Sequence, residues 1–111
     1  GERWHALGFE GRARVLRSAR RMLADRAEEA IEVVVSETGK AWEDAQSAEV
    51  TFGLLALGFW AGRAEGFLRE ERRRMRSPLG LGRRASVSYV PYGVVGVISP
   101  WNYPLALPLA D

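Results

Sequence analysis

The sequence contains no cysteine, and this absence excludes several kinds of site. Without thiols, these 111 residues can form neither a disulfide framework nor a thiolate metal site. Histidine is nearly absent too, since His5 is the only one and lies near an end, where an exposed side chain is typical. We therefore expect no metal site in this chain. The lack of cysteine fits a reducing compartment, and we expect the protein to be cytoplasmic.

Long apolar runs and a secretory signal are also missing. The longest apolar stretch, TFGLLALGFWAG at residues 51–62, is well short of the roughly 20 residues that a membrane-spanning helix needs. The first residues show no basic flank followed by an apolar core, which is the pattern of a signal peptide. We expect no membrane partner.

Lysine occurs only once, as Lys40, so the positive charge comes almost entirely from arginine. The net charge is +2, and much of the excess arginine lies in residues 69–84. Such a run could contact the phosphates of a nucleic acid. Because Pro78, Gly80 and Gly82 interrupt it, the pattern favours a solvated helix end and an exposed loop. We expect no nucleic-acid partner.

What is present has the composition of an ordinary globular protein, with 47% hydrophobic and 27% charged residues. The length is enough for one modest domain and too short for two. The sequence opens on Gly1 and stops at Asp111, inside what reads as the first turns of a helix. We expect a fragment of a longer protein.

Apolar residues recur at helical spacing in three successive segments. These predict helices over about residues 9–26, 25–39 and 42–71. The expected buried faces are, in order, Val15, Leu16, Ala19, Met22 and Leu23; Ala27, Ala30, Ile31 and Val34; and Ala45, Ala48, Phe52, Leu55 and Phe59.

Local signals mark the ends and the packing of these helices. Asp25 is the expected cap of the second helix, with Glu28 completing a capping box, and Gly39 is its expected stop. Lys40 then suits the negative end of the helix dipole. Glycine weakens a helix by roughly 1 kcal/mol relative to alanine. The third helix tolerates four, so close packing is expected at Gly53, Gly58, Gly62 and Gly66.

After the arginines the apolar period changes to two. Residues 84–90 alternate as in a half-exposed strand, which Pro91 ends. Residues 93–98, GVVGVI, are apolar on both faces, as in a parallel strand covered by helices. Pro104 suits the first turn of a helix that continues to residue 111. A lone parallel strand leaves its backbone unpaired, so we expect further strands from outside this segment.

The stretch ISPWN, residues 98–102, lies where such a strand meets the next helix. Ligands of open α/β sheets bind beyond the carboxyl ends of the strands. Pro100 stiffens the backbone there, so the amide of Asn102 could donate to an oxyanion while Trp101 covers a flat ligand. Residue types alone favour a different interpretation, in which Asn102 caps the helix and Trp101 lies in the core.

Two stretches carry a family resemblance. PYGVVGVISPWNYPL, residues 91–105, resembles the signature P-x-G-V-V-G-x-I-x-P-W-N-x-P that opens the cofactor-binding domain in the aldehyde dehydrogenase superfamily. SETGKAWEDAQSAEV, residues 36–50, resembles the E-x-G-K stretch of that family and its following Glu-Val pair. The resemblance covers about residues 8–111 and is nearest to bacterial succinate-semialdehyde dehydrogenases. This family lacks the G-x-G-x-x-G phosphate loop, so the absence of that loop excludes nothing.

The resemblance implies roles for six residues. Asn102 matches the asparagine whose amide, with a backbone amide at the catalytic cysteine, holds the aldehyde oxygen as it becomes an oxyanion. Tyr103 matches an aromatic position of the substrate tunnel. The positions that match the NAD or NADP site are Ile98, Ser99, Pro100 and Trp101.

The resemblance also implies a reaction. In the family a cysteine thiolate attacks the aldehyde, hydride passes to the cofactor, and a glutamate-activated water releases the acid. The implied parent is an NAD(P)-dependent aldehyde dehydrogenase acting on a small aldehyde, with succinate semialdehyde the nearest likeness. We expect these residues alone to be inactive, because they contain neither the catalytic cysteine nor the segment that carries the catalytic glutamate.

The expected fold class is α/β, with N-terminal helices followed by the first strands of a Rossmann-type parallel sheet that is incomplete as given. Residues 1–83 would form the N-terminal helical segment of the cofactor-binding domain. Residues 84–92 would be a strand of the oligomerisation region, and residues 93–111 the first strand and helix start of the dinucleotide-binding core. The full-length protein is expected to form a homodimer or homotetramer.

Two other interpretations remain open at this point. One is a non-catalytic member of the same fold, kept for structure or assembly. The other is a basic helical module that binds nucleic acid through the arginine run, although no recognition motif supports it.

Overall fold

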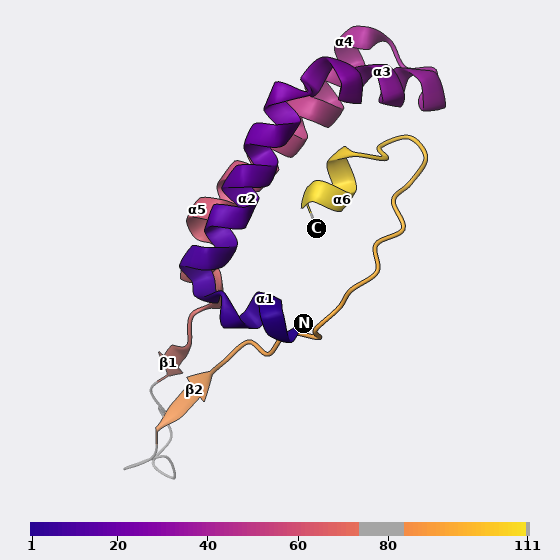
Figure 1. The fold of residues 1–111 in the computed structure, drawn as a ribbon. Helices are drawn as coiled ribbons and strands as arrows, with labels where there is room; N and C mark the ends of the chain where they lie inside the picture. Colours follow the sequence, from indigo (N-terminus) through magenta and orange to yellow (C-terminus); the bar gives the residue numbers. More distant parts are fainter. Residues whose placement is uncertain (74–83, 111) are drawn as a thin grey trace.

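Two long helices, α2 (Gly8–Asp25) and α5 (Phe52–Leu68), run antiparallel along each other and make the most extensive contact in the chain (Figure 1). The computed structural model describes residues 1–73 and 84–110. A short helix α1 (Glu2–Ala6) precedes α2. Helix α3 (Ala27–Thr38) crosses the far end of the pair. The predicted first and second helices are thus confirmed to within a few residues.

The predicted third helix changes its winding near its start. It comprises α4 (Trp42–Asp44), a π-helical segment η1 (Ala45–Thr51) and α5. In a π-helix the hydrogen bonds run from i to i+5, so each turn holds more residues than an α-turn. The helix ends at Leu68, three residues before the expected end at Glu71.

The extra residue in the π segment rotates everything after it, so the predicted buried face is confirmed at Ala45 and wrong from Phe52 onward. Phe52, Leu55 and Phe59 are 45%, 62% and 49% exposed. Besides Ala45, the buried residues are Glu49, Val50, Gly53 and Leu57, none of which belongs to the predicted face. A strict α-helical count from Ala45 misses this face, because it assumes 3.6 residues per turn throughout.

The expected capping box of α3 is also wrong. Asp25 is the last residue of α2, Arg26 occupies the cap position, and no side chain caps the helix. The Arg26 guanidinium instead donates to both carboxylate oxygens of Glu29, at 2.8 and 2.5 Å. These hydrogen bonds lower the pKa of the Glu29 carboxyl and raise the pKa of Arg26. At the other end the expected stop is confirmed, since Gly39 has a left-handed φ of 72°.

A small apolar core forms where α3 packs on the π segment. Its buried members are Ile31, Val34, Ala45 and Val50. Half-buried residues that pack around it come from four parts of the chain: Leu23, Ala27, Ala30, Val35, Leu54 and Leu105. The predicted inner face of α3 is confirmed, whereas Val15 and Met22 of the predicted α2 face are 45% and 59% exposed.

Strands β1 (Glu71–Arg73) and β2 (Ala85–Val87) pair antiparallel, with Arg72 opposite Ser86. Part of the strand expected at residues 84–90 is therefore confirmed, and β1 was not predicted. The helix end and loop expected for the arginine run are replaced by β1 up to Arg73. Arg74, Arg76 and Arg83 of that run lie outside the described residues.

The buried parallel strand expected at residues 93–98 does not form. Among residues 1–73 and 84–110 nothing pairs with it, and this segment instead runs extended and apart from the helix pair toward α6 (Ala106–Ala110), as Figure 1 shows. Val94 and Ile98 are 82% and 99% exposed. As expected from the sequence, a lone strand has neither a partner strand for its backbone hydrogen bonds nor helices to cover it. The parallel part of the predicted fold class is therefore not observed.

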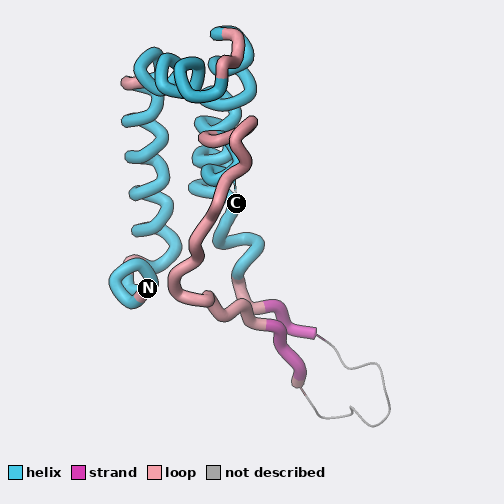
Figure 2. Tube along the Cα trace, turned by 90° about the vertical axis from the view of Figure 1, so that its right-hand side faces the viewer, coloured by secondary structure: helices cyan, strands magenta, loops and turns pink. Residues whose placement is uncertain are grey.

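The radius of gyration is 18.9 Å, against about 13 Å for a compact domain of about 100 residues. The excess reflects the hairpin of β1 and β2, which projects beyond the end of the helix pair (Figure 2), and the open segment between β2 and α6, which stands away from the helices (Figure 1). The chain is therefore an open arrangement around one small core. In the described part of the chain no helix is long and apolar enough to cross a membrane.

Close packing explains only some of the glycines in the third helix. A Cβ atom on Gly53 would lie 2.8 Å from the Leu109 Cδ1 atom of α6 and 3.6 Å from the Leu23 Cδ2 atom of α2. A Cβ atom on Gly62 would meet nothing within 4 Å. Gly53 therefore lets α5 approach two neighbours, and Gly62 has no such role in the described structure.

We expect Gly53→Val to lower the free energy of unfolding by about 1–3 kcal/mol, because the added carbons overpack the contact with α6. The same substitution at Gly62 should change it by less than about 0.5 kcal/mol. Urea denaturation of the full-length protein measures both. Equal effects at the two positions would show that α6 does not pack on Gly53.

Candidate functional site

The predicted site residues surround a turn at residues 100–103. The Tyr103 backbone N–H donates to the Pro100 carbonyl oxygen at 3.2 Å, which closes a four-residue turn. Trp101 and Asn102 occupy its two central positions, and both are exposed. Since α6 begins at Ala106, Asn102 does not cap it, and Trp101 at 81% exposure is not a core residue of the described chain. The interpretation favoured by residue types alone is therefore wrong.

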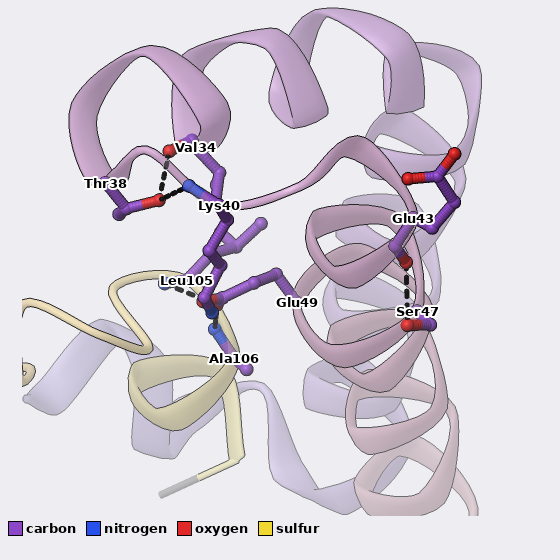
Figure 3. A network of polar contacts seen from close by, with 8 residues as sticks. All are labelled: Val34, Thr38, Lys40, Glu43, Ser47, Glu49, Leu105 and Ala106. Atoms are coloured by element: carbon purple, nitrogen blue, oxygen red, sulfur yellow. Dashed lines mark hydrogen bonds and ion pairs between the residues drawn. The ribbon is translucent and has the colours of Figure 1, made fainter.

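Just after this turn, the chain is held by the buried carboxylate of Glu49. One of its oxygens, Oε2, accepts hydrogen bonds from the backbone N–H groups of Leu105 at 3.1 Å and Ala106 at 2.8 Å (Figure 3). Glu49 is 0% exposed. These two amides open α6 and have no partner within that helix, so Glu49 supplies the cap that Asn102 does not.

The other carboxylate oxygen, Oε1, forms an ion pair with the Nζ atom of Lys40. The Lys40 side chain is 17% exposed, so this pair is largely withdrawn from water. Breaking one partner of a buried pair usually costs several kcal/mol, because the other charge is left uncompensated. The Lys40 charge thus meets Glu49, and its expected interaction with the α3 dipole stays a prediction.

Lys40 also reaches the predicted substrate residue. Its Nζ atom lies 3.9 Å from the centroid of the Tyr103 ring, within the range of a cation–π contact. One ammonium group thus contacts both the carboxylate that holds α6 and the ring at the end of the turn. The structure brings Tyr103 into the same cluster as the E-x-G-K stretch.

The end of α3 sets the position of Lys40. The Thr38 hydroxyl donates to the Val34 carbonyl oxygen at 2.7 Å and accepts from the Lys40 backbone N–H at 3.2 Å (Figure 3). Between them, Gly39 turns the chain through its left-handed conformation. Thr38 and Gly39 together direct Lys40 back toward the π segment.

The π segment sets the position of Glu49. Because Ala45, Glu49 and Val50 all face inward there, the carboxylate enters the core beside Val50 instead of pointing outward. At its far end α6 is tied to α5, since the Trp60 Nε1–H donates to the Ala110 carbonyl oxygen at 2.9 Å. The turn at residues 100–103 is thus followed directly by a helix held at both ends.

The four predicted cofactor residues lie before and within the turn. Ile98 is 99% exposed, Ser99 is half-buried, and Pro100 and Trp101 are exposed. They form a continuous stretch with Asn102. Nothing in the structure tests what they bind, so their roles stay predictions.

The sequence reasoning missed Lys40 and Glu49 as parts of one site. Both stand in the stretch at residues 36–50 that carries the family resemblance, and Lys40 is the only lysine of the chain. A buried carboxylate cannot be recognised from an acidic residue in a helical pattern, because the π segment decides which way it faces. The available signal was the resemblance, whose second stretch contains both residues.

The arrangement defines what the turn can do chemically. Between residues 93 and 110 Tyr103 is the only residue with a titratable side chain, so acid–base catalysis has little basis there. The Asn102 amide can donate hydrogen bonds, and Ile98 and Trp101 offer apolar surface. Among the described residues no group of three or more potential ligands could hold a metal ion.

Comparison with known proteins identifies the family to which these residues belong. The model of the aldehyde dehydrogenase family matches residues 1–111. The chain belongs to the aldehyde dehydrogenase family.

Similar proteins occur in mycobacteria. A protein of Mycobacterium ulcerans with the provisional name succinate-semialdehyde dehydrogenase (NADP(+)) 2 is 35% identical over 97% of this chain and 20% of its own length. Mycolicibacterium smegmatis has one with the same provisional function that is 37% identical over 90% of this chain and 19% of its own. The Mycobacterium tuberculosis H37Rv relative is 35% identical over the same shares.

The chain thus spans about a fifth of the length of the curated relatives that it matches. No solved structure gives a significant match.

We expect Thr38→Val to lower the free energy of unfolding by about 1 kcal/mol, because it removes the hydroxyl that joins Val34 and Lys40. Thr38→Ser keeps the hydroxyl and should lose clearly less. Urea denaturation of the full-length variants measures the difference. If the serine variant is the less stable of the two, the hydroxyl does not hold this corner.

Proposed function

We propose that the protein containing this chain oxidises an aldehyde to a carboxylic acid with NAD or NADP, and that Asn102 stabilises the oxyanion of that reaction. The observation that carries the proposal is the exposed amide of Asn102 on a closed turn followed by a helix held at both ends. Family membership supports the reaction class.

The proposed role of Asn102 follows from the negative charge that the aldehyde oxygen acquires during the reaction. When a nucleophile adds to an aldehyde, the carbonyl oxygen becomes negative, and a fixed N–H donor stabilises that state more than the neutral aldehyde. A donor held beforehand loses little free energy to reorganisation at the moment of reaction. The nucleophile and the general base have to come from residues other than these 111, which contain no cysteine.

The residues before Asn102 suit a nicotinamide dinucleotide. Residues 93–103 carry no charged side chain, and Ile98 and Trp101 expose apolar surface that can cover a flat ring. We assign Ile98, Ser99, Pro100 and Trp101 to this contact and Tyr103 to the aldehyde. The cofactor, when bound, accepts hydride. The names of the mycobacterial relatives favour NADP.

Succinate semialdehyde is the proposed substrate, because the named relatives carry that substrate in their provisional names. We retain the division of the chain into residues 1–83, 84–92 and 93–111 as part of the proposal, with a homodimer or homotetramer as the full-length state. A cytoplasmic location and the absence of a nucleic-acid partner belong to it too. The described segment alone should have no activity.

We expect Asn102→Ala in the full-length enzyme to lower kcat for aldehyde oxidation by roughly 10²–10³-fold, the usual effect of losing one oxyanion donor. Gln46→Ala removes an amide of the same type from an exposed position on the π segment and should leave kcat unchanged. Steady-state kinetics with circular dichroism as a check of the fold measures this. Unchanged turnover in Asn102→Ala would remove the residue from the mechanism.

The substrate has its own test. We expect kcat/KM for succinate semialdehyde to exceed that for butanal, an uncharged aldehyde of the same chain length, by at least about tenfold, because a site built for the distal carboxylate leaves its polar groups unpaired with butanal. Initial rates with NADP and then NAD measure both preferences. A preference for butanal would exclude succinate semialdehyde and leave the reaction class intact.

A further inference from the structure

We propose that Glu49 and Lys40 are positioning residues for the active site, Glu49 acting through the backbone that follows Asn102 and Lys40 through the ring of Tyr103. This inference rests on the proposed function of Asn102 and Tyr103. Neither positioning residue needs to touch the substrate in order to act.

A short stretch of backbone connects the segment that Glu49 holds to Asn102. Glu49 holds the N–H groups of Leu105 and Ala106, and only two residues separate Leu105 from Asn102. One of them is Pro104, whose ring fixes its φ angle. With the turn closed by the hydrogen bond from Tyr103 to Pro100, few backbone angles remain free between the anchor and the amide.

Lys40 contacts both the Glu49 carboxylate and the Tyr103 ring. A carboxylate buried without compensation is strongly destabilising, so the two amides and the Lys40 ammonium together make the anchor possible. The same ammonium lies over the face of the Tyr103 ring, where the contact depends on the position of that ring. Lys40 therefore couples the orientation of Tyr103 to the anchor that holds Asn102.

If Glu49 served only to cap α6, a neighbouring residue would be enough. The start of a five-residue helix is commonly capped by a serine or aspartate beside it in sequence. Here the cap comes from a residue 57 positions before Ala106 and has a buried cationic partner of its own. The cluster therefore joins the π segment, the end of α3 and the start of α6 at one point, next to the proposed site (Figure 3).

The test uses the full-length enzyme with Glu49→Gln. The amide keeps one acceptor oxygen but cannot serve both the backbone N–H groups and Lys40, so the anchor loosens. We expect kcat to fall at least about tenfold, with a smaller change in the aldehyde KM. Glu43→Gln is the matched control, since Glu43 is exposed and its side chain points away from the cluster, and it should leave kcat unchanged (Figure 3).

A double-mutant cycle separates positioning from a general loss of stability. If Glu49 acts through Asn102, Glu49→Gln should cost less than about twofold in kcat once Asn102→Ala is present. An equal cost in both backgrounds would overturn the proposal. Should Glu49→Gln not yield folded enzyme, Glu49→Asp, which keeps the charge and shortens the reach, replaces it under the same criteria.

Hydrogen exchange gives a readout that is independent of activity. In Glu49→Gln the amides of Leu105 and Ala106 should exchange at least about fivefold faster than in the parent, while α2 keeps its protection. Unchanged exchange there would overturn the anchor. If Asn102→Ala retains full activity, the proposed function of Asn102 fails, and the exchange result still decides whether Glu49 holds this segment.

Lys40 has a separate expectation. Lys40→Met should raise the aldehyde KM by at least about threefold through the freed Tyr103 ring, and Lys40→Arg, which keeps the cation, should restore most of it. Because Lys40→Met also leaves Glu49 without its cation, kcat should fall too; in a Tyr103→Leu background this loss of kcat should remain while the threefold change in KM disappears. A KM effect that persists in that background would show that Lys40 does not act through the ring.

Discussion

The buried carboxylate of Glu49 is the constraint on which this structure depends. A charge withdrawn from water requires compensation on every side, and the chain supplies it with the Lys40 ammonium and the amides of Leu105 and Ala106. Glu49 and its partners come from three separate segments. Because the carboxylate cannot be satisfied unless all three meet, the end of α3, the π segment and the start of α6 are fixed relative to one another.

The π segment is what makes this possible. It turns Glu49 and Val50 inward together, so one turn of helix contributes to the apolar core and to the polar anchor. The same turn rotates the rest of α5, which places Gly53 under Leu109 and directs Trp60 to the last described carbonyl of α6. π-Helical insertions are often found at functional sites, where they aim a side chain that regular winding would misplace.

The proposed site residues lie on one exposed side of the chain. Residues 93–102 present apolar surface and one amide, while the core of the chain lies behind them around α3 and the π segment. Contiguous exposed apolar surface of this kind marks a place that contacts a ligand, a partner or another segment. The open shape and the exposed turn are therefore two aspects of the same arrangement.

The sequence alone determined the first two long helices to within a few residues, the start of the third at Trp42, the stop at Gly39 and, through the stretches at 36–50 and 91–105, the family. These features depend on local spacing and on residue types. Tertiary structure decided the buried face of α5, the lack of a sheet around residues 93–98 and the meeting of Lys40 with Glu49 and Tyr103. The physical reason is that winding, strand pairing and burial of charge depend on partners distant in sequence, which no local pattern encodes.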